Sequence, residues 1–333
     1  MPDLPSELRA ALTAAAEQYP ASVLAAVTTR LIARYQDGAP AGPGESVLRS
    51  DSDAVAYATY RMPATYAAVH AALGALAGLV PDFTPNTHLD VGGGTGAAMW
   101  AAAALWPGMV SHRVIDEIPA VIELGRRLAA GSTSAAVRGA RWQRADLAED
   151  PALPPADLVT VSYVLGELGA DPRAALLAQL AQRLVRSSGV LVLVEPGSVA
   201  GFARILAARA SALAAGMSVV APCPHAGPCP MGAGGDWCHF SARLPRSSAH
   251  RRAKGAARGF EDEKFSYLVA STQPGARAQA RVVRHPQLRK GVVSLQLCGD
   301  PPGLRAELVS KRQGEHYRAA RRANWGDAWP PTT

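Results

Sequence analysis

A run of glycines directly after a short apolar segment is the first feature with recognisable chemistry. Asp90 is followed by Gly92, Gly94 and Gly96 on alternate positions, and an alanine-rich helical pattern continues to Trp106. This order predicts a strand, a tight turn and a helix. Glycine lets a backbone approach a ligand closely and adopt positive φ, and the helix presents free N–H groups and its positive dipole end. We therefore predict a nucleotide-binding site.

The residues around the glycines bear on the type of nucleotide. No Lys-Ser or Lys-Thr pair follows them, which argues against a P-loop. The spacing Asp90-x-Gly92-x-Gly94-x-Gly96 resembles motif I of the class I S-adenosylmethionine-dependent methyltransferases, in which the glycines pass under the methionine part of the cofactor. A NAD-type Rossmann domain and a turn without a ligand remain the alternatives.

The methyltransferase interpretation gives roles to two further acids. Asp116, with Glu117 as its alternate, ends the second predicted strand, where that family binds the ribose hydroxyls. Asp146 follows the third predicted strand, where the family contacts the adenine amino group. The predicted cofactor-binding residues are Asp90, Gly92, Gly94, Gly96, Asp116 and Asp146.

The stretch after the fourth predicted strand, Ser162–Leu168, carries no catalytic signature. It lacks the Asn/Asp-Pro-Pro-Tyr motif of amino-directed methyltransferases and the cysteine nucleophile of a cytosine-C5 enzyme. Glu195 ends the fifth strand, where it either faces the cleft or helps to cap Pro196-Gly197. The catalytic residues are therefore unknown, and whether the protein is an enzyme stays open.

The four cysteines are the second feature with chemistry. Cys223, Cys229 and Cys238 lie in one Pro/Gly-rich stretch, and Cys298 ends an apolar strand. In a reducing compartment such thiols are more often metal ligands than disulfide partners. Their wide spacing departs from the tight knuckles of a zinc ribbon and suits a [4Fe–4S] cluster. Zinc and four inert buried thiols remain alternatives.

Hydrophobic periodicity places these features in an α/β architecture. Residues 1–80 are predicted as a helical region, and residues 81–215 as the alternating strands and helices of a doubly wound sheet. Residues 216–264 are predicted as a cysteine-rich, metal-binding and basic insertion. Residues 265–333 are expected to supply strands that complete the sheet and a basic tail.

Composition limits the function classes. The chain has 333 residues, of which 48% are hydrophobic, enough for a sizeable core. Its net charge of +7 and its pI of about 9.5 suit an anionic partner such as RNA. We find no signal-peptide pattern and no uninterrupted apolar stretch long enough to span a membrane. The expectation is a cytoplasmic protein without a membrane or DNA partner.

A basic run follows the cysteine-rich stretch, and basic character continues from Arg284 to Arg322. Such side chains neutralise phosphates and give salt-dependent affinity, although a solvated charge run is the usual structural alternative. A bound metal would help to order this stretch, which has little apolar content of its own. The predicted RNA contacts are Arg246, Arg251, Arg252, Lys254 and Arg258.

Several segments together resemble the small-ribosomal-subunit Rsm-type methyltransferase-like family, which includes bacterial members and mitochondrial assembly factors of yeast and animals. The likeness covers most of the chain from about residue 50 onward. Besides the glycine turn and Cys298, the segments are Tyr60–Tyr66, Val194–Gly197, Pro222–His225, Cys229-Pro230, Asp236–Phe240, Glu261–Tyr267, Val309–Lys311 and Trp325–Asp327.

The resemblance implies a class I methyltransferase fold, with S-adenosylmethionine as cofactor, that acts on or near the rRNA of the small ribosomal subunit in assembly or translation. It also implies a [4Fe–4S] cluster on Cys223, Cys229, Cys238 and Cys298. Such a protein is either an rRNA methyltransferase or a non-catalytic assembly factor, and the missing catalytic motif favours the second. A small-molecule methyltransferase with a structural metal site is the alternative, and it predicts a closed apolar pocket over Ser162–Leu168.

Overall fold

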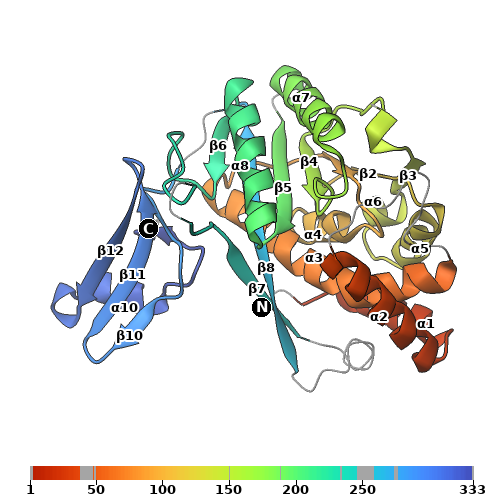
Figure 1. Cartoon of the computed structure of the whole chain (residues 1–333), viewed down its shortest axis with the longest axis horizontal. Coiled ribbons are helices and arrows are strands. Elements are labelled where there is room, and N and C mark those ends of the chain that lie inside the picture. The colour runs from red at the N-terminus through yellow and green to blue at the C-terminus, as the bar shows by residue number, and fades with distance from the viewer. Residues whose placement is uncertain are drawn as a thin grey trace.

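The computed structural model describes residues 3–37, 48, 50–149, 151–187, 189–232, 235–245, 259–273 and 277–331. These residues build a large sheet with helices on both faces and a smaller antiparallel sheet beside it (Figure 1). The large sheet holds the glycine turn, and the cysteines lie where the two sheets meet.

Three helices precede the large sheet: α1 (Ser6–Glu17), α2 (Ala21–Asp37) and α3 (Asp51–Leu79). The Ser50 hydroxyl accepts a hydrogen bond from Asp53 N at 3.2 Å and caps α3, a role for which serine is a preferred residue. By length and composition α3 could cross a membrane, contrary to our expectation from the sequence. However, 56% of its apolar window is buried inside the protein, so α3 is apolar because it is a core helix.

The large sheet has the strand order β3-β2-β1-β4-β5-β8-β6, and β7 pairs with β8. The strands β1 to β5 run parallel, whereas β8 is antiparallel to β5. The order reverses at β1, and ligands of such sheets bind at this switch point, outside the carboxyl ends of the strands. The strands are β1 Thr87–Val91, β2 Ser111–Asp116, β3 Arg141–Arg144, β4 Leu158–Ser162, β5 Val190–Pro196, β6 Ser218–Ala221, β7 Phe240–Pro245 and β8 Phe260–Ser271.

Helices cover both faces of this sheet (Figure 1). The N-terminal helices pack with α4 and α5 in one apolar cluster, and α7 and α8 pack in another. Every residue of β4 is buried, as expected for a parallel strand covered on both sides. The remaining helical elements here are α4 Ala97–Leu105, α5 Pro119–Ala130, α6 Ala135–Arg138, η1 Leu147–Glu149, α7 Ala170–Ser187 and α8 Val199–Ala214.

The smaller sheet has the order β10-β11-β9-β13, with β12 on β11. Alternate residues of β11 (Val293, Leu295 and Leu297) form its own core with Trp329 and Ala320. Its elements are β9 Ala280–Val282, β10 Gln287–Arg289, β11 Val292–Gly299, β12 Gly303–Ser310, η2 Lys311–Gln313, α10 Glu315–Arg322 and β13 Ala328–Trp329.

This arrangement corrects the predicted division of the C-terminal half. The sequence predicted that residues 265–333 complete the large sheet, but only β8 does so, and β9 to β13 form a sheet of their own. Conversely, residues 216–264, predicted as an insertion, contribute β6, β7 and the start of β8 to the large sheet. Apolar side chains alternate along β11 and face one side of the smaller sheet, where they form a core of its own. The smaller sheet therefore buries its apolar face without packing into the large sheet.

Candidate functional site

The glycine turn lies between β1 and α4, and its three alternate glycines have positive φ: +65° at Gly92, +57° at Gly94 and +86° at Gly96. A Cβ on Gly92 would lie 2.2 Å from Val164, so this glycine is needed for packing. At Gly94 the nearest atom to an added Cβ belongs to Val121, at 3.9 Å. Gly94 therefore borders open space, where a ligand could approach the backbone.

Asp90 lies underneath the turn. Its side chain is fully buried and accepts a hydrogen bond from the Thr160 hydroxyl at 2.8 Å. A Cβ on Gly93 would lie 2.6 Å from the Asp90 carboxyl group, so the carboxyl group supports the turn directly. Burial raises the pKa of Asp90 to about 7, although the Thr160 hydrogen bond opposes the shift. Asp90 thus supports the turn from below.

A chain of buried hydrogen bonds runs from Asp90 across three strands. His88 Nε2 lies 2.8 Å from the Thr160 hydroxyl oxygen, and His88 Nδ1 lies 3.1 Å from His112 Nδ1. Because the Thr160 proton goes to Asp90, His88 Nε2–H is the donor to Thr160 and His112 Nδ1–H the donor to His88. Burial lowers the pKa of His88 and brings that of His112 to about 4, so both rings are neutral. Sequence reasoning missed both histidines.

The two acids predicted to contact the cofactor are placed differently. Asp116 accepts hydrogen bonds from Gly94 N at 2.9 Å and Ile118 N at 3.0 Å, so it ties the end of β2 to the turn. Burial raises its pKa despite these bonds. A carboxylate has further lone pairs with which it can accept ribose hydroxyls. Asp146 is exposed beyond β3 and caps η1 through Ala148 N at 2.8 Å.

The loop after β4 packs directly on the glycine turn through Val164. Glu195 holds this loop: its carboxylate accepts from Leu165 N at 3.0 Å and pairs with Arg204 at 2.6 Å. Glu195 is buried and its carboxylate contacts Leu165 and Arg204, so it supports the loop after β4, a role that neither of the two predicted positions described. On the same loop Glu167 reaches solvent, but surrounding protein atoms and the carboxylates of Asp116, Glu117 and Glu195 raise its pKa to about 8.

Tyr163 follows β4 directly and has a φ of +62°, a strained value for a bulky residue. Its hydroxyl donates to Glu263 Oε1 at 2.8 Å, and Arg61 Cζ lies 4.6 Å from the centre of its ring. Arg61 also donates to both Glu263 oxygens, at 3.0 and 3.3 Å. Two distant elements, α3 through Arg61 and β8 through Glu263, thus hold Tyr163 in the loop where the sequence shows no catalytic motif. The sequence offered one partial signal, the arginine between tyrosines in α3.

The four predicted metal ligands line one cavity of about 40 Å³. Cys223, Cys229 and Cys238 come from the segment between β6 and β7, and Cys298 comes from β11 of the smaller sheet. Burial and then the neighbouring thiols raise the pKa of Cys298 to about 12 and also raise that of Cys238. Within the described residues, no three Cys, His, Asp or Glu side chains are arranged to hold a metal ion. The metal centre stays a prediction.

Two buried arginines border the cavity and bear on what it can hold. Arg209 donates to the carbonyl oxygens of His225 and Gly227, at 2.9 and 2.8 Å, and Arg281 to those of Pro222 and Gly326, both at 2.9 Å. Neither forms an ion pair among the residues that the structure describes, and one guanidinium nitrogen of each has no hydrogen-bond partner. Four thiolates around a dication would leave about two excess negative charges, which these two arginines match.

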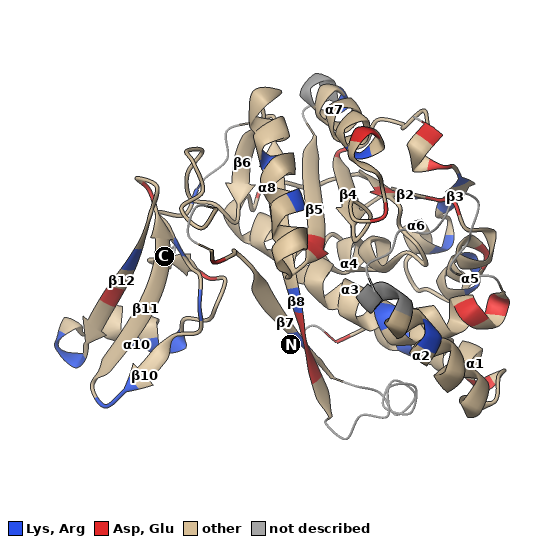
Figure 2. Cartoon of the chain, in the orientation of Figure 1, with Lys and Arg blue, Asp and Glu red and all other residues tan. Residues whose placement is uncertain are grey.

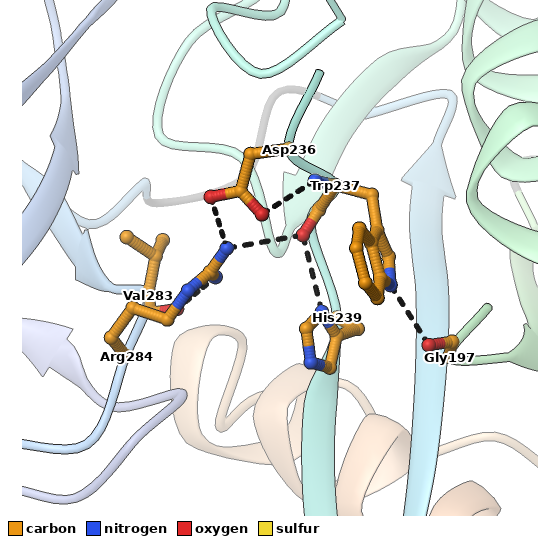
Figure 3. Close-up of polar contacts among 6 residues, drawn as sticks. All are labelled: Gly197, Asp236, Trp237, His239, Val283 and Arg284. Carbon is orange, nitrogen blue, oxygen red and sulfur yellow. Dashed lines mark hydrogen bonds and ion pairs between the residues drawn. The ribbon is translucent and has the colours of Figure 1, made fainter. Parts of the chain in front are cut away.

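A polar network joins the cysteine segment to both sheets (Figure 3). The Trp237 indole donates to the Gly197 carbonyl oxygen at 2.9 Å, beside α8, and its ring stacks on His239. Asp236 pairs with Arg284 of the smaller sheet, whose guanidinium also reaches the Trp237 carbonyl at 3.4 Å. The network therefore fixes the segment that carries Cys238. The predicted RNA contacts Arg246, Arg251, Arg252, Lys254 and Arg258 lie outside the described residues.

Comparison of the sequence with known protein families identifies relatives of this chain. A profile described as mitochondrial small ribosomal subunit Rsm22 matches residues 51–330. The chain belongs to the Rsm22 family. This confirms the family predicted from the sequence segments, and the match begins at the first residue of α3.

Two relatives show how much of the sequence this chain shares with known proteins. Human ribosome assembly protein METTL17, mitochondrial, is 30% identical over 295 residues, which cover 83% of this chain and 62% of METTL17. The Rsm22-cox11 tandem protein 2, mitochondrial, of Schizosaccharomyces pombe is 26% identical over 330 residues, which cover 84% of this chain and 43% of the tandem protein. The chain thus spans less than two thirds of either relative.

Among solved structures, human N-acetylserotonin methyltransferase in complex with S-adenosylmethionine matches 74% of this chain and 67% of its own. The sequence identity is 16% and the TM-score is 0.44. A likeness at this level is partial and assigns no role to any residue of this chain.

Proposed function

We propose that this chain is an S-adenosylmethionine-binding assembly factor of the small ribosomal subunit. The observation that carries the proposal is the open backbone approach at Gly94, at the switch point of the sheet, in a chain of the Rsm22 family. Its human relative is named a ribosome assembly protein. The partner is the small subunit with its rRNA. Localisation in the cytoplasm stays a prediction, and the named relatives are mitochondrial.

The surroundings of the turn support S-adenosylmethionine over a nicotinamide dinucleotide. The cofactor would pass over Gly94, with Asp116 accepting from the ribose and Asp146 near the adenine. A NAD-type Rossmann sheet has six parallel strands in the order 3-2-1-4-5-6, whereas here the antiparallel β8 lies between β5 and β6. Titration calorimetry with S-adenosylmethionine and with NAD tests this assignment. Binding of NAD alone would contradict it.

The loop after β4 supports a non-catalytic role. Tyr163 is held there by Glu263 and Arg61, and Glu195 fixes Leu165, so the loop lies under constraint from several elements. Transfer of a labelled methyl group to assembling small subunits tests this point. Labelled rRNA would make the protein a methyltransferase, and cofactor binding without labelling would make the domain a scaffold. No observation on the described residues favours a small-molecule substrate.

The cysteine cavity supports a resident metal group as part of the same proposal. Cys223, Cys229, Cys238 and Cys298 would hold a [4Fe–4S] cluster or, alternatively, zinc. Bound there, the group would link the large sheet to the smaller one, because its ligands come from both. Iron, acid-labile sulfide and zinc are measured on anaerobically purified protein. About four irons and four sulfides per chain indicate the cluster, and absence of all three elements would contradict a metal site.

A further inference from the structure

The positive charge of the protein is concentrated in the smaller sheet. Residues 277–331 contain eleven Lys and Arg but four Asp and Glu, and their excess of seven equals the net charge of +7 of the whole chain. The rest of the chain is therefore balanced in charge. Three of the four acids are already engaged, because Glu307 pairs with His316, Glu315 with Arg318, and Asp327 accepts from Asn324 N. The excess positive charge therefore belongs to residues 277–331, the smaller sheet with its helices, which we call the C-terminal module.

Four of these cations gather at one end of the sheet, which we call the basic tip: Arg289, Lys290, Lys311 and Arg312. The register places them together, because Arg289 pairs with Val292 of β11, and Val292 pairs with Ser310 of β12. Lys311 N donates to the Gly291 carbonyl oxygen at 2.8 Å. All four side chains are exposed, and none has an ion pair within the described part of the chain. Figure 2 shows blue segments at the lower end of this sheet.

The other end of β11 is the root of the module. Cys298 lies there, in the wall of the cysteine cavity, six residues beyond Val292. At about 3.3 Å per residue, the basic tip lies about 20 Å from that cavity. The root is also anchored by Arg281 and by the Asp236–Arg284 pair. The module is therefore an arm, fixed at the cysteine end and charged at the free end (Figures 1 and 2).

We propose that the basic tip is a docking surface for the phosphate backbone of structured RNA. Exposed, unpaired cations at the ends of β10 and β12, the two strands that pair with β11 here, give the sequence-independent, salt-dependent attraction that a polyphosphate backbone needs. The inference rests on the proposed function, in which rRNA is the partner, and it adds the surface of the protein that binds the rRNA. It differs from the RNA contacts predicted at Arg246–Arg258, which lie outside the described residues.

The test measures binding of the full chain to a transcript of small-subunit rRNA from the same organism by fluorescence anisotropy across a salt series. The tip variant Arg289→Glu with Lys290→Glu is compared with Arg126→Glu plus Arg141→Glu, which changes the net charge equally on the far side of the large sheet. A second tip pair, Lys311→Glu with Arg312→Glu, repeats the test from a different segment. Thermal unfolding of each variant confirms that it folds.

We expect each tip pair to weaken binding at least tenfold and to reduce the salt slope by about 1.5, since two contacts are lost at about 0.7 to 0.9 each. The control pair is expected to bind within about twofold of the wild type. Equal weakening by the control and tip pairs would overturn the inference, because net charge alone would then explain it. So would normal binding by both tip pairs.

Two outcomes separate this inference from the proposed function. If Arg251→Glu with Arg252→Glu abolishes binding and both tip pairs bind normally, the RNA face is elsewhere; the tip is refuted and the rRNA partner stands. If the wild type shows no salt-dependent binding to the transcript, both the rRNA partner and the tip are refuted.

Discussion

The Thr160 hydroxyl donates a hydrogen bond to Asp90 Oδ1 at 2.8 Å, which joins β4 to β1 directly below the glycine turn. The same hydroxyl accepts from His88, so one side chain satisfies two buried groups. Both partners lie in the interior, where an unpaired polar group costs more than it does in water. The geometry of the turn therefore depends on a hydroxyl that itself lies below the ligand site.

Replacement of Thr160 by valine tests this dependence. Thr160→Val keeps the shape but removes the donor to Asp90 and the acceptor for His88, so we expect a loss of about 1 to 3 kcal/mol in the free energy of unfolding. Urea denaturation of the purified protein measures it. The control is Thr29→Val, on an exposed position of α2, which should change stability by no more than about 0.5 kcal/mol. Equal losses of stability in the two variants would show that the buried hydrogen bonds of Thr160 do not stabilise the fold.

The raised pKa of Asp90 predicts a pH dependence. Its pKa is about 7 in the folded protein and 3.8 in the reference state, so between these values the folded state binds more protons than the unfolded state. Stability therefore falls as pH rises from about 4 through 7, by up to about 4 kcal/mol for this group. Asp90→Asn should flatten that slope in unfolding curves recorded without cofactor. An unchanged slope would mean that the pKa of Asp90 is the same in the folded and the unfolded state.

Local patterns explain what the sequence could predict. The parallel strands, the cap at Ser50 and the glycine turn all depend on residues close together in the chain, and the structure has them. The clustering of the cysteines could be expected from three of them lying within one segment. Cys298 was grouped with them as the fourth cysteine of the chain, but no local pattern shows that it reaches the cavity, because it does so by the pairing of β11 with β9 and β12.

Long-range pairing explains what was missed. His88 and His112 are adjacent only because β1 and β2 pair in that register, and each alone is an ordinary strand residue. The positive φ of Tyr163 has no local signal, since its contacts to Arg61 and Glu263 span 102 and 100 residues. The second sheet has β13 at its edge, paired with β9, and the two residues of β13 are too few for a periodic pattern.

The open space at Gly94 predicts a loss of cofactor binding without a loss of fold. Gly94→Val adds side-chain atoms where the backbone would approach the ligand, at a φ of +57° that valine disfavours. We expect affinity for S-adenosylmethionine to fall below detection in calorimetry, with stability reduced by about 1 to 3 kcal/mol. Gly78→Val in α3 is the control, because an added Cβ there meets no atom within 4 Å and the position lies away from the turn. Retained binding by Gly94→Val would refute the site.

The cysteine cavity predicts a joint loss of metal and of the connection between the sheets. Cys229→Ser removes one thiolate, so we expect the protein to lose its metal and the segment from residue 216 to 300 to become more sensitive to protease. Met231→Leu changes the wall of the same cavity at nearly constant volume and should keep both properties. Limited proteolysis and metal analysis are run on the same preparations. Unchanged metal content and protease resistance in Cys229→Ser would exclude a four-cysteine centre, because a site missing one of four ligands would not bind its metal equally well.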